Sequence, residues 1–289
     1  MSGFHAITAL ALSGAFVFGI VLALLGSIKL TLAKRLQISE TQVGILLSAL
    51  NLALLPMVLL SGLLIDQWGV RLVMILGSFV TCVAIYGLTL HQTSYRLAVV
   101  AILLVGLGAA CVSTASVVLM PQAFFSGRPD MLGAALNLGM AFFALGALVT
   151  PALVDVLLAR LSFRTTLGLV AVLCLTPALL AVVANIPGES QKATLGQVVA
   201  DRYFWVAGLV FFLYAPLEAS VGTWATTFLL EMGNRERRVA WLLSGFWLAF
   251  LASRLLAAYL QVAADAWVIL TLGVLAAVLL GSLAGAPNR

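Results

Sequence analysis

Long stretches without charge limit how this chain can fold more than any other feature of its sequence. Seven of them run for 23 residues or more without an acidic or basic side chain: 1–28, 41–65, 72–95, 97–127, 131–154, 165–188 and 266–288. About 20 helical residues cross a bilayer core about 30 Å thick, so each stretch is long enough to span it. Hydrophobic residues make up 63% of the chain, which excludes a soluble enzyme, a disordered protein and a disulfide scaffold.

Nine transmembrane helices are expected. We place them near 8–30, 43–65, 70–90, 97–118, 131–153, 164–186, 204–230, 239–260 and 266–284. Strands of a membrane barrel would be about ten residues long with alternating polarity, which these runs do not show. The prediction is an all-α polytopic protein of a plasma membrane, with the bacterial inner membrane as the expected location.

One polar stretch divides the chain. Residues 187–203 read PGESQKATLGQVVADRY and begin with a proline–glycine pair that ends a helix. This predicts a six-helix bundle over 1–186, a linker over 187–203 and a unit of three helices over 204–289.

The loop cations give the first indication of topology. The net charge is +5, and the basic residues stand singly or in small groups in short loops, where they act as topology signals and contact lipid headgroups. Loops after odd-numbered spans carry eight of them: Lys34, Arg35, Arg96, Arg160, Arg164, Arg235, Arg237 and Arg238. Loops after even-numbered spans carry four: Arg71, Arg128, Lys192 and Arg202. Taken alone, this bias places the N-terminus outside.

The loop between spans two and three carries a recognisable pattern. Residues 62–71 read GLLIDQWGVR. Gly62 is expected to let its helix approach a neighbour, and Asp66 to accept backbone N–H groups at a helix start. Gly69 is expected to form the turn, and Arg71 to meet headgroups or a carboxylate. The pattern resembles the G-x-x-x-D-x-x-G-x-R/K loop of the major facilitator superfamily, in which it acts as a gating loop.

Three further stretches resemble the same superfamily. Residues 140–151, with small side chains and a late proline, are similar to its fifth helix. Tyr214, Glu218, Gly222 and Trp224 form a Y-x-x-x-E-x-x-x-G-x-W pattern that resembles the fucose-permease-like branch. Residues 244–254 fit the eighth helix of that branch, although Ser253 stands where a glycine usually precedes the arginine.

This resemblance implies a transporter of six plus six helices built from three-helix repeats, working by alternating access. Nine spans supply three repeats, and the last repeat is expected to be missing, either because the chain is a fragment, because it is a short natural form, or because it assembles with another protein. The resemblance also places the 62–71 loop in the cytoplasm. This contradicts the cation count, and we adopt the family orientation.

Glu218 lies near the middle of the seventh span, where an acidic side chain costs about 2.5–3.5 kcal/mol of insertion free energy. Because burial favours the neutral form of a carboxyl group, Glu218 is the candidate proton carrier. The alternative is a carboxyl group that hydrogen-bonds between helices. Tyr214 shares its helix face, and Trp224 shares it only if Pro216 and Gly222 distort the helix.

Four other polar residues lie inside or at the ends of spans. Arg254 and Lys29 either pair with a carboxylate or an anionic solute, or extend to lipid headgroups. Asn51 and Asn137 are candidates for contact with the solute, although an interhelical hydrogen bond is the commonest role of such amides.

No catalytic set, nucleotide-binding motif, cofactor site or metal site is expected. His5 and His91 are far apart, and the three cysteines lie inside apolar runs. The sequence therefore favours a secondary transporter for a small polar solute, with a sugar as the family-level substrate and a proton as the coupling ion. The alternative is a non-transporting membrane protein that acts by helix association, as a homo-oligomer or as a subunit. The expected partners are the solute and the lipid bilayer, not nucleic acid.

Overall fold

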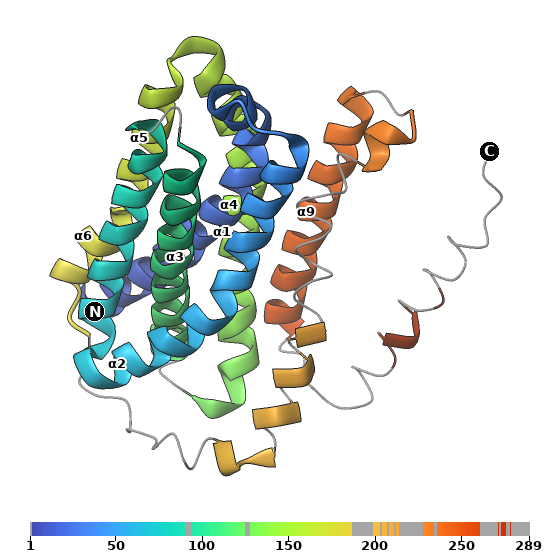
Figure 1. Cartoon of the computed structure of the whole chain (residues 1–289). Helices are drawn as coiled ribbons and strands as arrows, with labels where there is room; N and C mark the ends of the chain where they lie inside the picture. Colours follow the sequence, from blue (N-terminus) through green and yellow to red (C-terminus); the bar gives the residue numbers. More distant parts are fainter. Residues whose placement is uncertain are drawn as a thin grey trace.

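The computed structural model describes residues 2–90, 94–124 and 128–186. Beyond them it describes 199–202, 204–206, 208–210, 212–213, 228–233, 236–260, 271, 273–275 and 278. The main elements are all helical, which confirms the predicted all-α class (Figure 1). They are α1 (Ser2–Leu36), α2 (Glu40–Leu90), α3 (Tyr95–Ala123), the short 3-10 helix η2 (Pro129–Met131), α4 (Leu132–Arg160), α5 (Phe163–Leu173), α6 (Thr176–Val183) and α9 (Glu236–Leu260).

Apolar length makes these helices membrane spans. In the described residues, five helical segments are long and apolar enough to cross a bilayer: His5–Lys29, Thr41–Leu90, Tyr95–Ala123, Leu132–Arg160 and Phe163–Val183. Large apolar side chains such as Leu52, Phe79 and Val172 are exposed on the outside of the bundle. Lipid is the solvent in which such a surface is stable.

Two predicted spans are joined within α2 by a single glycine. Gly69 has φ 81° and ψ 156°, and it separates two helical arms that match the expected spans 43–65 and 70–90. Only glycine adopts this backbone conformation without steric cost. The chain turns here at one end of the bundle (Figure 1), so the expectation that Gly69 forms the turn is confirmed.

The predicted span 164–186 is interrupted in its middle. α5 ends at Leu173, and α6 begins at Thr176 with Pro177 in its first turn. Pro177 has no N–H to bond the carbonyl of Leu173, four residues earlier. The hydroxyl of Thr176 donates to that carbonyl oxygen at 2.6 Å instead. A polar group freed at membrane depth is thus satisfied within the same span.

Glycines let α1 lie directly against α4. A methyl group added at Gly19 would overlap the carbonyl oxygen of Phe143, and one added at Gly146 would overlap that of Phe16. We call this contact the α1–α4 seam. Among the described residues, by contrast, no atom lies within 4 Å of a Cβ added at Gly62, so the close approach expected there is not found in this part of the chain.

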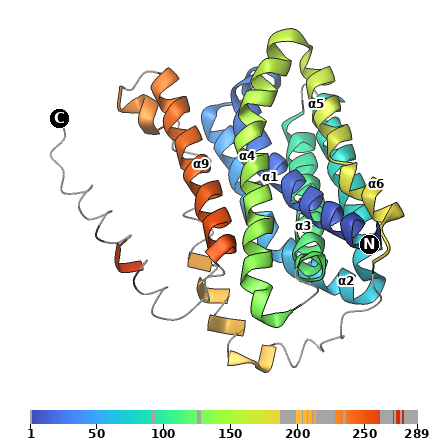
Figure 2. The ribbon, with the colours of Figure 1, turned by 180° about the vertical axis from the view of Figure 1, so that it is seen from behind.

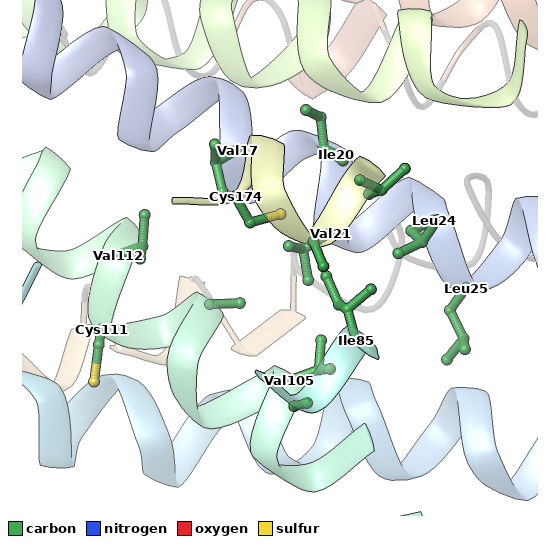
Figure 3. Close-up of a cluster of buried hydrophobic side chains, with 14 of the residues drawn as sticks. Val17, Ile20, Val21, Leu24, Leu25, Ile85, Val105, Cys111, Val112 and Cys174 are labelled. Carbon is green, nitrogen blue, oxygen red and sulfur yellow. The ribbon is translucent and has the colours of Figure 1, made fainter. Parts of the chain in front are cut away.

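One apolar core joins the first six helices, α1 to α6. Val21, Ile85 and Val105 come from α1, α2 and α3 and meet in it (Figure 3). Leu167 of α5 and Ala181 of α6 are also fully buried. α9 lies outside this core, beside α4, in both views of the ribbon (Figures 1 and 2).

Substitution of Gly19 by alanine should destabilise the bundle by about 1–3 kcal/mol, because the added methyl group must push the two backbones of the α1–α4 seam apart. Thermal unfolding in detergent, followed by the fraction that remains monodisperse after heating, measures the change. Gly26→Ala is the matched control on the same helix, because nothing lies within 4 Å of its added Cβ. An equal loss of stability in both variants would contradict the seam.

Candidate functional site

Three of the predicted site residues, Tyr214, Glu218 and Trp224, lie outside the described residues, in the segment 214–227. Most of the remaining candidates fall into two groups, and Asn51 and Lys29 belong to neither. One group lies where α4 meets α9, and the other lies at the turn within α2.

Asn137 and Arg254 are brought together by the contact between α4 and α9. Asn137 follows the start of α4 by about one and a half turns, and its Nδ2 donates to the carbonyl oxygen of Gly133 at 2.9 Å. Its Oδ1 accepts a hydrogen bond from Nη1 of Arg254 at 3.3 Å. The expectation of an interhelical hydrogen bond is confirmed for Asn137, across 117 residues of sequence.

One aromatic ring lies against Arg254, and it belongs to a group of rings between α1, α4 and α9. The Arg254 guanidinium carbon lies 4.8 Å from the ring centre of Phe250, at cation–π distance. Phe143 of α4 meets Trp247 and Phe250 of α9 edge to face, with ring centres 6.2 and 6.4 Å apart. Phe18 of α1 stacks on Phe143 at 5.5 Å. We call these four rings, Phe18, Phe143, Trp247 and Phe250, the aromatic cluster.

The aromatic cluster was not predicted from the sequence as part of a site. Phe143, Trp247 and Phe250 lie in stretches that the sequence marked only for their family resemblance. An aromatic residue in an apolar run carries no sign of whether it faces lipid or a partner helix. The spacing of residues could have pointed to this cluster, because Phe250 precedes Arg254 by one helical turn and therefore shares its helix face.

The α2 turn holds the second group, and here Arg71 differs from the expectation. Its Nη2 donates to the carbonyl oxygen of Ala184 at 2.6 Å, at the C-terminal cap of α6. A cation at a helix C-terminus is favoured by the helix dipole. In the described residues, the partner of Arg71 is a backbone carbonyl and not a carboxylate, and contact with headgroups stays a prediction. Asp66 is exposed and, among the described residues, makes no hydrogen bond of the predicted capping kind.

Asn51 and Lys29 are not joined to the α4–α9 contact. Nδ2 of Asn51 donates to the carbonyl oxygen of Leu47 on its own helix at 3.2 Å, so the expected interhelical bond is wrong for this residue. Lys29 is partly exposed near the end of the apolar part of α1, and its side chain is not without a partner. Within the described residues, no group of three or more His, Cys, Asp or Glu side chains could hold a metal ion.

Loss of the Arg71 side-chain donor should loosen the last turn of α6. In Arg71→Met, backbone amide exchange over residues 180–184 should rise up to about tenfold, because one part-buried hydrogen bond is worth about 0.5–1.5 kcal/mol. Arg164→Met is the matched control, since Arg164 instead donates to Oη of Tyr86, at 2.9 Å, from the first turn of α5. Unchanged exchange in Arg71→Met would show that this bond does not hold the end of α6.

Comparison with known proteins identifies the family. The family model described as the Major Facilitator Superfamily matches residues 10–287. A solved structure of a transporter of this superfamily, FucP in its outward conformation, matches with TM-score 0.68 and 18% identity, over 88% of this chain and 70% of that chain. A variant of the E. coli fucose:proton symporter FucP matches with TM-score 0.67 and 19% identity, over 89% of this chain and 71% of that chain. No curated protein matches the chain by sequence. With its family model matched over nearly its whole length, and with the helical fold of these transporters, the chain belongs to the Major Facilitator Superfamily.

Proposed function

We propose that this chain moves a small polar solute across the membrane by alternating access, with residues 1–186 and 204–289 as the two moving units and 187–203 as their linker. The observation that carries the proposal is the contact between them. In the described residues, α1 to α6 share one core, whereas α9 packs on α4 through the Asn137–Arg254 hydrogen bond and a separate apolar cluster around Phe143, Ala147 and Trp247. Units with separate cores can rock against each other without breaking either core.

A sugar-like solute and a proton are proposed as the transported pair. The support is the fold likeness to a fucose:proton symporter and the Y-x-x-x-E-x-x-x-G-x-W pattern at 214–224. In this proposal Glu218 carries the proton, while Tyr214, Trp224, Asn137 and Asn51 face the solute. Protonation would remove the charge of Glu218 and lower the cost of excluding water while the units change position.

The turn within α2 is proposed to face the cytoplasm of a bacterial inner membrane. Two of the eight cations that oppose this orientation have packing partners at the other end of the bundle. The Arg35 guanidinium lies 4.5 Å from the ring centre of Phe163, and Arg164 is hydrogen-bonded to Tyr86. Cations held by aromatic rings serve the fold as well as topology, so the bare cation count overstates the topological signal.

Single cysteines test this orientation. In a cysteine-free background, an impermeant maleimide added to intact cells should label Leu161→Cys, in the turn between α4 and α5, and should leave Gln67→Cys unlabelled. Both native side chains are exposed, so access to reagent decides the result. Labelling of Gln67→Cys before cell lysis would reverse the topology and support the cation count.

Transport itself is tested in proteoliposomes, after a thermal-shift screen of sugars and small organic acids has identified a solute. Glu218→Gln, which mimics the protonated side chain, should abolish uphill uptake driven by a pH gradient and leave solute exchange largely intact. Asp155→Asn is the control, because Asp155 is an exposed carboxylate near the end of α4.

Three other results would each be informative. Uphill uptake by Glu218→Gln would show that the proton travels elsewhere. Equal loss of binding, exchange and uptake would assign Glu218 to the solute site or to the fold. Absence of solute uptake by the unmodified chain under every gradient would contradict the transport proposal as a whole.

A further inference from the structure

The contact between α4 and α9 extends from near one end of both helices to their middle, where Ala147 and Trp247 belong to the same apolar cluster. In the described residues, the hydrogen bond and the ring contacts join residues 137–143 of α4 to residues 247–254 of α9. These are the first half of α4 and the second half of α9. The two helices draw apart toward the end where α4 finishes and α9 begins (Figures 1 and 2).

The end that is closed is the one that carries the α2 turn. Arg71, two residues after Gly69, binds the end of α6, and α4 begins at this same end of the bundle (Figure 1). Arg160 marks the opposite end, where α4 stops. We refer to these as the Gly69 end and the Arg160 end.

The pair that closes the Gly69 end is suited to repeated breaking. Its donor is charged and its acceptor is a neutral amide, so no second charge has to be desolvated when the two meet. The separation of 3.3 Å is slightly beyond the usual range for N–H···O bonds, which makes this a modest contact. Asn137 is positioned by its own bond to Gly133, and the Arg254 guanidinium by the ring of Phe250.

We infer that Asn137 and Arg254 form a latch that holds the Gly69 end closed while the Arg160 end is apart, and that this bond opens in each transport cycle. The inference rests on the proposed alternating access. It makes Arg254 a positioning residue that sets the balance between the two arrangements. The aromatic cluster supplies the apolar contact about which the helices turn.

Distances between spin labels test the latch without any solute. In a background in which Cys82, Cys111 and Cys174 are alanine, one pair of cysteines at Leu132 and Leu260 reports the Gly69 end. A second pair at Val156 and Leu242 reports the Arg160 end. All four native side chains are exposed. Pulsed electron paramagnetic resonance in detergent then gives the population of each arrangement at both ends.

Asn137→Ala should raise the population with a separated Gly69 end about tenfold, which corresponds to about 1.4 kcal/mol. The distance at the Arg160 end should shorten in the same molecules. Asn137→Asp should do the opposite at both ends, because a carboxylate binds the guanidinium more strongly than an amide does. Arg254→Lys, which keeps a charged donor, should fall between the unmodified chain and Asn137→Ala.

Ser27→Ala is the matched control, since it removes a hydroxyl that donates to the carbonyl oxygen of Ala23 on its own helix. Unchanged distances in both Asn137 variants would overturn the latch. Broadening at both ends together would also overturn it, because that result describes a loosened fold rather than a shifted balance. Failure of the transport proposal appears instead in the uptake assay, which these distances do not use.

Discussion

Direct contact between backbones at small residues is the interaction on which the bundle depends. Lipid is as apolar as the helix surfaces, so burial of apolar side chains gives little reason for helices to associate. At the α1–α4 seam, Gly19 and Gly146 let each helix reach the carbonyl of the other. Gly77 and Gly108 do the same between α2 and α3. Dispersion at these short separations then provides the attraction that water would provide elsewhere.

The α1–α4 seam also fixes the position of α4 within the bundle. One side of this helix is fixed to α1 through Gly146, while Asn137 and Phe143 reach α9. α4 is therefore a rigid part of the first unit and, at the same time, its contact surface for the second. The α4 residues that contact α9 and the α4 residue of the α1–α4 seam lie on one continuous helix. A displacement of α9 that pulls on α4 would therefore move the six-helix bundle as a whole.

Much of this fold could be predicted from the sequence, because each membrane span appears there as a long stretch without charged residues. The turn at Gly69 was predictable for the same kind of local reason, since its pattern needs a residue with positive φ. The interruption at Pro177 was missed, because a proline in an apolar run does not reveal whether a neighbouring hydroxyl replaces the lost bond. A glycine permits a close approach but does not show which face meets a neighbour, so the described helices meet closely at Gly19 and Gly146 and not at Gly62.

The candidate site was less predictable than the fold. Asn137 and Arg254 stood out from the sequence because polar groups are rare within spans. Their pairing could not be derived, since it depends on how α4 and α9 cross. Asn51 and Asn137 are both amides inside apolar spans and both donate to a carbonyl four residues earlier, but in the described residues only Asn137 also meets Arg254. Nothing in the sequence indicates that the rings of the aromatic cluster lie together. Only the packing of the helices brings them into contact.

The position of the aromatic cluster gives α4 arms of unequal length. Phe143 lies about 9 Å along the axis from Asn137, and about 26 Å from Arg160, at 1.5 Å of rise per residue. A helix that tilts about this ring moves its far end roughly three times as far as its near end. If α4 and α9 turn about this ring as proposed, a separation of about 1 Å at the short arm corresponds to a shift of about 3 Å at the long arm, so a small loss of contact near Asn137 would accompany a larger change in helix spacing at the Arg160 end.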